Sequence, residues 1–563
     1  EVLDRQPAPT RRFLLATGVL DRLCAPLCDA LLAPEADTPH AAPPAAGDSQ
    51  TVLEELERAN LFLVPLDDER VWYRYHRLFA DALRARLARE AGADAAAALH
   101  QRASAWFGRQ GLLAEAIGHA LAGGATEDAA TWLEALTPTL ISQSAIHHSL
   151  EQWLASLPES VVRARPLLCL QRAWLLMYRL HMEPAATWVE AAQQALPVAA
   201  DGPPGPETRR WRGAITATQA YLATTGPAPA PAQALAWVEA ALADLPADEV
   251  AFRSVAHHAL GQAALIQGQV DRAEQAFAAV ATTGRAAGIA HGTLVATVQQ
   301  VSLQRVRGAR RQALATARAA LDWAGEHTEP GTPGVGMLSV LLADLLRDGN
   351  AVAAALPLAT EGLHAVRQYG NAPPIALVAS LSLARLHLAE GDAAGAGAVL
   401  AEARPLVLDG PFAVLASLLD AVEAEVLIAQ GDPAAAVNWV MTAAALDPAS
   451  GARFGGVIFA AGVEALGVTP ARILLAQGMV TGDAALLRQA ERHLDAAWHL
   501  AEGQGLGWLR LRVLILRALL ADARGDRDAT MASLAAAVAQ AAPEGVIRPF
   551  RDEGEPMAAL LAD

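Results

Sequence analysis

The chain has 563 residues, a formal net charge of −17, and 53% hydrophobic but only 5% aromatic residues. This composition favours closely packed helices rich in alanine and leucine, and the negative charge disfavours nucleic-acid binding by the chain as a whole. Every one of the 43 basic residues is arginine, which excludes a P-loop lysine and any lysine Schiff base. Three cysteines are too few for a disulfide framework, and apolar runs such as Leu509–Leu520 are broken by arginine. We therefore expect a cytoplasmic protein without a membrane span.

The beginning of the chain is predicted to form a winged-helix domain. The expected elements are helices at 11–17 and 21–32, a Pro/Ala-rich loop at 33–48, a helix at 51–60, and strands at 61–66 and 70–76. The strands flank Asp67-Asp68-Glu69, which is expected to be a charged hairpin turn. The wing could contact DNA, although packing against a neighbouring domain is the commoner role of such a domain. Its candidate DNA-contacting residues are Arg70, Trp72, Arg74 and Arg77.

No pattern in the sequence predicts a catalytic or metal site. Cys24 and Cys28 lie four residues apart on one helix face, but no second Cys/His pair with ligand spacing is near them. We therefore expect Cys24 and Cys28 to be buried as small apolar residues. The adjacent histidines at 147–148 and 257–258 lack the i, i+4 spacing of metal ligands.

A recurring glycine organises the second half of the chain. These glycines are 40, 41, 42 and 40 residues apart, and each is followed five positions later by alanine. Each can end one helix in a left-handed conformation, and an Asp or Asn after several of them can cap the next helix. The period predicts an all-α fold: a tetratricopeptide-like (TPR-like) right-handed α-solenoid of stacked helix pairs. The glycines are Gly268, Gly308, Gly349, Gly391 and Gly431, with a degenerate copy at Gly525.

We expect the chain to have four parts. They are a winged-helix-like domain at 1–90, a helical connector at 91–160, a TPR-like superhelix at 161–545, and a C-terminal tail at 546–563. Near 450–482 the repeat period lengthens, which indicates that one unit carries a long or broken helix. A solenoid needs polar caps at its ends, and this short tail is expected to seal the last pair incompletely, which favours self-association.

A candidate ligand site follows from counting back from each glycine along the preceding helix. The residue six positions before the glycine changes identity between repeats, whereas the residue seven before it is small or apolar throughout. A polar row beside a packing row is typical of a concave binding face, and a solvated face without a ligand is the equal alternative. The candidate ligand-binding residues are His258, Gln262, Ser302, Arg305, Arg385 and Glu425.

Arg385 and Glu425 can also pair with each other on this face. An exposed pair of this kind would contribute about 0–1 kcal/mol. Replacing Arg385 by alanine is then expected to weaken ligand binding while barely changing the melting temperature.

Both ends of the chain resemble a known family. The opening strings EVLDRQPAPTRRFLLATGVLDRLCAPLCDALL and LEELERANLFLVPLDDERVWYRYHRLFADALRARL, and the closing string PEGVIRPFRDEGEPMAALL, resemble MalT-like transcriptional activators, LuxR-type regulators of the signal-transduction ATPase class. The repeats between them are similar to the family's sensor domain only in style. The resemblance implies an ATP-binding domain before this chain and a DNA-binding helix-turn-helix after it. The chain itself is expected to need no cofactor.

Three functions remain open. The resemblance favours the sensor region of a transcription regulator, which binds a small-molecule or peptide effector in its groove and reaches DNA only through the missing C-terminal domain. A stand-alone TPR-like scaffold for peptides or proteins would have the same groove. An enzyme is the third hypothesis, and the lack of a nucleophile–base pair or metal set in the sequence weighs against it.

Overall fold

The computed structural model describes most of the chain as helices in two compact units. The first unit holds Glu1–Leu140, Ser144–Leu175 and Glu190–Leu196, and the second holds Ile141–Gln143, Leu176–Val189 and Pro197–Asp563. The described residues are 3–33, 48–136, 147–179, 181–197, 204–225, 228–328, 331–368, 373–408, 415–443, 452 and 455–562.

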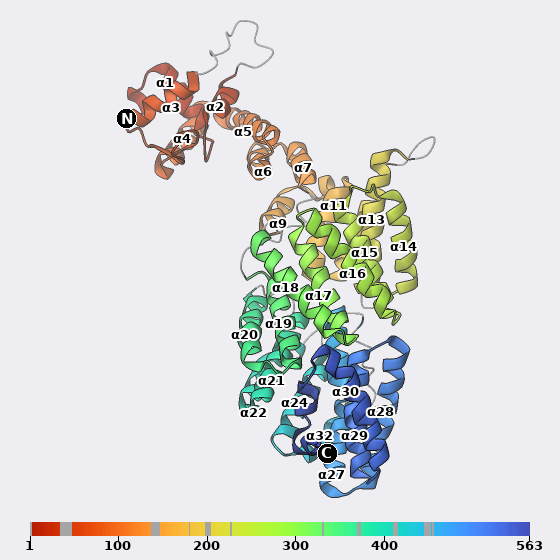
Figure 1. The fold of residues 1–563 in the computed structure, drawn as a ribbon. Helices are drawn as coiled ribbons and strands as arrows, with labels where there is room; N and C mark the ends of the chain where they lie inside the picture. Colours follow the sequence, from red (N-terminus) through yellow and green to blue (C-terminus); the bar gives the residue numbers. More distant parts are fainter. Residues whose placement is uncertain are drawn as a thin grey trace. The chain divides into compact units, whose positions relative to one another are not determined.

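The first unit begins with the predicted winged helix (Figure 1). Its elements are a 3-10 turn at Leu3–Arg5, α1 (Ala8–Thr17), α2 (Ala25–Leu32), α3 (Asp48–Arg58), β1 (Leu63–Pro65) and β2 (Tyr73–Tyr75). The strands pair antiparallel, with Val64 opposite Arg74. The Asp67 carboxylate accepts hydrogen bonds from the backbone N–H groups of Val71 (2.8 Å) and Trp72 (2.9 Å), which explains the acidic turn. The predicted loop at 33–48 lies almost entirely outside the described residues, and Asp48 already begins α3.

Two cysteines of the first unit are buried by apolar packing. Cys24 and Cys28 are buried in the same hydrophobic core as Tyr73, as expected from their spacing, and burial raises the pKa of the Cys28 thiol well above its ordinary value. The wing arginine Arg70 donates to Glu57 (3.1 Å), and Arg22 stacks over the Trp72 ring.

The helices that follow are α4 (Arg77–Glu90), α5 (Gly92–Arg109), α6 (Leu113–Ala122), α7 (Thr126–Ala135), α9 (His147–Ser156) and α10 (Glu159–Arg163).

The helices α11 (Pro166–Tyr178) and α12 (Met182–Gln194) follow. From α13 onward the helices form consecutive pairs, which stack in the second unit as a TPR-like solenoid (Figure 1). We call the first helix of each pair the A helix. The pairs are α13 (Pro206–Thr225) with α14 (Pro231–Asp244), α15 (Val250–Ile266) with α16 (Val270–Ala286), α17 (Ala290–Val306) with α18 (Arg310–His327), α19 (Pro333–Asp348) with α20 (Val352–Gln368), α21 (Pro373–Glu390) with α22 (Ala393–Ala403), α24 (Ala416–Ala429) with α25 (Pro433–Ala443), α27 (Thr469–Thr481) with α28 (Ala484–Gln504), and α29 (Gly507–Ala523) with α30 (Arg527–Ala541). The short α23 (Pro405–Leu408) follows α22.

The turn between the helices of a pair has the predicted chemistry. Gly268, Gly308, Gly391, Gly431 and Gly525 all have left-handed φ angles between 73° and 85°. Aspartates after three of these glycines cap the next helix: each carboxylate accepts a backbone N–H three residues on, at 2.8 to 3.1 Å. These aspartates are Asp392, Asp432 and Asp526.

One repeat departs from the predicted register. Gly349 has a φ of −86°, and its neighbour Asn350 adopts the left-handed conformation with φ 65°. The buried alanine five positions on is accordingly Ala355, whereas Ala354 is exposed. A Cβ at Gly349 would meet the guanidinium of Arg310, which would have to move aside. The whole repeat is therefore offset by one residue from the pattern that the sequence predicted.

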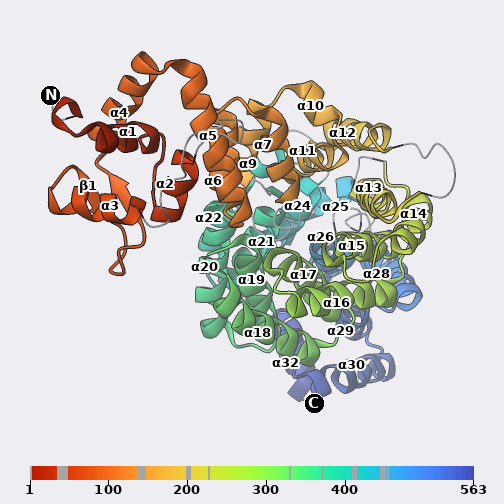
Figure 2. The same ribbon diagram turned by 90° about the horizontal axis from the view of Figure 1, so that it is seen from above.

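The lengthened period near 450–482 corresponds to an extra helix, α26 (Gly456–Gly467), between α25 and α27. It packs against α17, α21, α24, α27 and α29, so it lies along the A helices of several repeats (Figure 2). Every residue of α26 is buried. The stretch Gly456–Thr481 is apolar and long enough to cross a membrane by composition alone, but 94% of its most apolar window is buried inside the protein, as in a core helix.

The end of the chain is also helical. A 3-10 turn (Ala542–Glu544) leads to α31 (Arg548–Arg551) and α32 (Gly554–Ala562). The backbone N–H of Ile547 donates to the carbonyl of Asp348 (2.9 Å), and α31 packs against both α19 and α29. Phe550 and Met557 are buried. The tail therefore packs along the A helices of the second unit.

Candidate functional site

Three of the six predicted ligand-binding residues make local or packing contacts. The Gln262 side chain is 3% exposed, and its Nε2 donates to the carbonyl of Ala452 (2.6 Å). Ser302 Oγ donates to the carbonyl of Val298 one turn earlier in α17 (2.8 Å). The His258 ring packs against Tyr221 and Phe277, and burial lowers its pKa to about 4. Gln262 and Ser302 are therefore buried and His258 is half-buried, and contact of these three side chains with a ligand stays a prediction.

The other three predicted residues belong to one buried ion-pair network, which we name the Glu464 network. Glu464 lies on α26 and is contacted by arginines from three successive repeats. Its carboxylate pairs with Arg305 at 2.8 Å, Arg347 at 3.2 Å and Arg385 at 3.4 Å. Arg385 also makes two hydrogen bonds to Glu425, at 3.0 and 3.1 Å. One carboxylate of the inserted helix thus pairs with arginines of three successive A helices.

The expected Arg385–Glu425 pair forms, but it is buried and not exposed. The side chains of Arg385 and Glu425 are only 5% and 10% exposed. The small stability contribution of an exposed ion pair therefore does not apply to Arg385 and Glu425. Removing either partner of this buried pair leaves an uncompensated charge out of water. The expectation that Arg385 can be replaced without loss of stability is corrected on this ground. Contact of these residues with a ligand stays a prediction.

The electrostatics of the network are set by competition between burial and charge. Burial alone would raise the pKa of Glu464, but Arg305, Arg385 and Arg347 outweigh it and hold that pKa well below its ordinary value. Asp344 is the exception: burial raises its pKa to about 6 against the opposing pull of Arg305. Asp344 accepts a hydrogen bond from the Ser382 hydroxyl (2.9 Å).

The C-terminal helices extend the same network. Arg347 pairs with Asp552 (3.5 Å), and Arg472 on α27 pairs with Glu553 (3.0 Å). Arg310 donates to the carbonyls of Leu345 (2.7 Å) and Glu544 (3.0 Å). Carboxylates of α26 and of the tail therefore pair with A-helix arginines alongside carboxylates of the A helices themselves, such as Asp348 with Arg305 (2.8 Å) and Glu425 with Arg385.

Arg347, Asp344 and Glu464 are not among the residues that the repeat pattern predicted. Counting from Asn350 instead of Gly349 places Asp344 six positions before the left-handed residue and Arg347 three before it, in the rows of Gln262 and Arg305. An Asn after the glycine was the available signal, because Asn also adopts the left-handed conformation. Glu464 belongs to no repeat, and nothing in the repeat pattern pointed to it. Among the described residues, no group of three or more His, Cys, Asp or Glu side chains could hold a metal ion.

Comparison with known protein families assigns both parts of the chain. The MalT-like TPR region matches residues 213–563, and the MalT winged helix domain matches residues 1–95. The chain belongs to the MalT-like family. Its MalT-like TPR region contains the complete Glu464 network.

Individual relatives agree with this assignment. The transcriptional regulators MalT of Klebsiella pneumoniae and Yersinia enterocolitica are each 28% identical, over 78% and 79% of this chain and 46% and 47% of their own lengths. The serine/threonine-protein kinase PknK of Mycobacterium tuberculosis is 38% identical over 31% of this chain and 14% of its own length. The chain thus spans about half of the MalT proteins that it matches and a small part of the kinase.

Two solved structures match parts of the chain at low TM-score. A Rap protein complexed with competence and sporulation factor covers 67% of this MalT-like chain and 98% of its own, at 12% identity and a TM-score of 0.47. A signal transduction ATPase with a tetratricopeptide repeat sensor from Pyrococcus horikoshii covers 89% of this chain and 64% of its own, at 12% identity and a TM-score of 0.35.

Proposed function

We propose that this chain is the effector-sensing region of a MalT-like transcription regulator and that its effector binds where α26 now lies. The role is regulatory and cytoplasmic, and the ATPase-driven assembly and DNA binding that it controls belong to domains outside this chain. Family membership supports the sensor role. The observation that supports this effector site is that Arg305, Arg347 and Arg385 all pair with Glu464 of the inserted helix α26.

The inserted helix acts as an internal occupant of the inner face. A stack of A helices needs no extra helix to complete its own pairs, since each pair packs on its neighbours. In this chain α26 brings one carboxylate to three arginines, and Gln299 of α17 accepts the backbone N–H of Val457 at its start (3.3 Å). A small molecule or peptide that carries an acidic group and an apolar body has the chemistry to replace these contacts.

Competition between the effector and α26 for the same A helices would couple effector binding to the activity of the domains that this region controls. A ligand shifts a conformational equilibrium only by its difference in affinity for the two states. If the effector and α26 cannot occupy the A helices together, binding drives α26 out. Because Arg347 pairs with both α26 and the tail, release of α26 changes the contacts at the end of the chain as well.

Hydrogen exchange tests the proposal directly. Acidic peptides and small organic acids are screened by thermal shift against the purified chain, and hydrogen exchange is then measured for each compound that binds. We expect the amides of α26 to exchange faster in the complex and those of α17 and α21 to stay protected. Binding that leaves α26 fully protected would refute this site.

A matched pair of variants sharpens the test. Glu464→Gln removes the carboxylate from the network and should tighten effector binding about tenfold or more, because a larger fraction of molecules then has the site free. Glu423→Gln is the control, since Glu423 is a half-exposed carboxylate of α24 that pairs only with Arg404 among the described residues. Equal affinities for the two variants would contradict competition with α26.

A further inference from the structure

Exposed apolar side chains gather on the hairpin of the first unit. Of the eleven large hydrophobic side chains that are exposed among the described residues, five fall between positions 62 and 78. Single exposed apolar residues are ordinary on a protein surface, whereas a group of them marks an interaction surface. The five are Phe62, Val64, Leu66, Val71 and Leu78, which are 45% to 74% exposed.

The hairpin has one buried face and one exposed face. Along β1, Leu63 is buried, whereas Phe62, Val64 and Leu66 are exposed, because successive side chains of a strand point to opposite faces. Arg74 of β2 is the register partner of Val64 and is also exposed. We name Phe62, Val64, Leu66 and Arg74 the hairpin face.

Both edges of the hairpin disfavour the addition of another strand. Tyr73 of β2 exchanges two backbone hydrogen bonds with Leu23, at 2.8 and 2.9 Å, so that edge is occupied. The edge strand β1 carries Pro65, which has no N–H group to donate to a neighbouring strand. A partner is therefore expected to lie across the hairpin face and not to extend the sheet.

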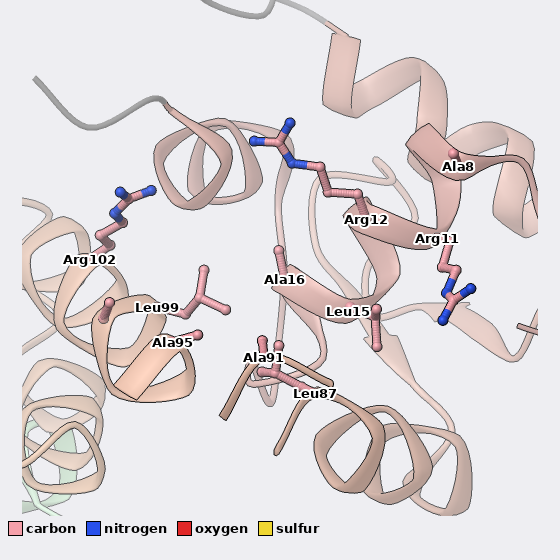
Figure 3. A pocket seen from close by; sticks show the side chains of 11 residues that line it. Ala8, Arg11, Arg12, Leu15, Ala16, Leu87, Ala91, Ala95, Leu99 and Arg102 are labelled. Atoms are coloured by element: carbon pink, nitrogen blue, oxygen red, sulfur yellow. The ribbon is translucent and has the colours of Figure 1, made fainter. Parts of the chain in front are cut away.

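A pocket between α1, α4 and α5 is a second apolar surface feature of this unit (Figure 3). It has a volume of about 480 Å³ and is lined by alanine and leucine side chains and three arginines. Its leucines, Leu15, Leu87 and Leu99, are buried or half-buried. The pocket thus already shields its apolar side chains from water, whereas the hairpin face leaves them exposed.

Two arginines determine which charge an occupant of the hairpin face needs. Arg74 lies within this face and Arg77 begins α4 just beyond it; both are exposed, and neither makes a hydrogen bond or ion pair with the residues that the structure describes. Asp68 and Glu69 lie in the turn, at the other end of the hairpin from Arg77.

A second copy of this chain is a poor occupant. Two hairpin faces related by a two-fold axis across Val64 and Arg74 would set each Arg74 against its own copy, and like charges that face each other disfavour association. The better occupant brings a carboxylate to Arg74 together with apolar side chains for its neighbours.

The spacing of the apolar side chains fits a helix. Phe62, Val64 and Leu66 are two residues apart, which places successive side chains about 7 Å apart along the strand. Residues four apart on a helix are about 6 Å apart along its axis. A helix laid along β1 can therefore bring an apolar side chain to each of the three, with acidic residues on the flank that faces β2.

We propose that the hairpin face docks an acidic amphipathic helix of a partner protein. Its apolar stripe packs on Phe62, Val64 and Leu66, and its carboxylates pair with Arg74 and Arg77. An amphipathic helix on an apolar surface is a recurrent mode of protein recognition. This surface lies on the winged-helix part of the chain and is independent of the effector site on the A helices.

Fluorescence anisotropy on the full 563-residue chain tests the proposal. The probe is a labelled amphipathic helical peptide of about 20 residues built from leucine and glutamate, and its counterpart has lysine in place of every glutamate. The glutamate peptide should bind saturably and at least about tenfold more tightly than the lysine peptide, and added salt should weaken its binding.

The net charge of the chain makes this comparison stringent. A chain with a net charge of −17 attracts the lysine peptide non-specifically, so a preference for the glutamate peptide requires a local cationic surface. Equal binding of the two peptides, a preference for the lysine peptide, or no saturable binding of the glutamate peptide would overturn the proposal.

Charge reversal locates the binding. Arg74→Glu should weaken binding of the glutamate peptide about tenfold or more and strengthen binding of the lysine peptide. Arg12→Glu is the matched control, at an exposed arginine of α1 that lines the pocket in Figure 3, and should change neither affinity. Glu464→Gln should also leave glutamate-peptide binding unchanged, which separates the hairpin face from the effector site. Glutamate-peptide binding that Arg74→Glu leaves intact in a folded chain would refute the assignment.

Val64→Glu distinguishes the other occupants. It places a charge among the apolar residues of the hairpin face at a position that is 49% exposed, so the fold should tolerate it, and it should weaken binding of the glutamate peptide. A dimer in analytical ultracentrifugation, or a complex with duplex DNA, that Val64→Glu abolishes would assign the face to that occupant and overturn the proposal.

Discussion

Replacing Arg385 by methionine should be among the most destabilising single changes on the inner face. Methionine keeps the apolar stem and removes the guanidinium that bonds twice to Glu425 and once to Glu464. Glu464 retains Arg305 and Arg347, whereas the Thr469 hydroxyl, at 3.3 Å, is the hydrogen-bond donor that remains to Glu425 among the described residues. The main cost therefore falls on Glu425.

The size of the effect follows from burial. Removing one partner of a buried ion pair typically costs about 3–5 kcal/mol, because the other charge stays out of water. Replacing both partners by apolar residues of similar volume is often neutral or stabilising. We therefore expect Arg385→Met to lose about 3–5 kcal/mol, and the double variant Arg385→Met/Glu425→Met to recover most of that loss.

Urea denaturation followed by helical circular dichroism measures these differences. A solenoid need not unfold in one step, so the midpoint is combined with hydrogen exchange of α21, α24 and α26. Arg404→Met is the matched control, since Arg404 pairs with Asp420 and Glu423 on a half-exposed surface and should cost about 0–1 kcal/mol. The reasoning fails if Arg385→Met stays within about 1 kcal/mol of the wild type, or if the double variant is no more stable than the single one.

Four further outcomes are expected. Burial raises the pKa of Asp344 from 3.8 to about 6, so the folded state binds this proton more tightly than the unfolded state and the stability from this group falls as the pH rises through that window. Asp344→Asn should accordingly raise the urea midpoint near pH 8 and leave it unchanged near pH 4; a pH-independent effect would exclude this titration. Asn350→Ala should cost about 1–2 kcal/mol in urea denaturation, because Ala is strained at the left-handed φ of 65°, whereas Asn350→Gly should be tolerated. The purified chain should neither hydrolyse ATP nor select duplex DNA at physiological salt in phosphate-release and mobility-shift assays; sequence-selective binding would point to the exposed Arg74 and Arg77 of the wing region. Small-angle scattering should show self-association as concentration rises, and a strict monomer at high concentration would count against an incompletely capped solenoid.

Local chemistry made the repeats predictable. A glycine or asparagine adopts the left-handed conformation at the end of these A helices, and an aspartate directly after it can cap the second helix of the same pair, so these positions keep a recognisable spacing. Alternation and a charged turn likewise predicted the wing hairpin. The one register error arose where two adjacent residues, Gly349 and Asn350, can both adopt the left-handed conformation and only Asn350 does.

Long-range packing decided the rest. The row of polar residues at the inner face was visible in the sequence, but its burial was not, because the covering helix α26 lies outside the repeat pattern and reads as an apolar segment with one acidic residue. Whether Glu464 is solvated or holds three arginines depends on where that segment folds back. The pocket is a further example, since Ala16 and Ala95 leave a hollow only because α1 and α5, far apart in sequence, face each other across it. The sequence by itself determined the helix pairs, their caps and the family, since those depend on neighbouring residues. Only the tertiary structure decided which charges are buried and which surfaces stay open, because desolvation is a property of the packed whole.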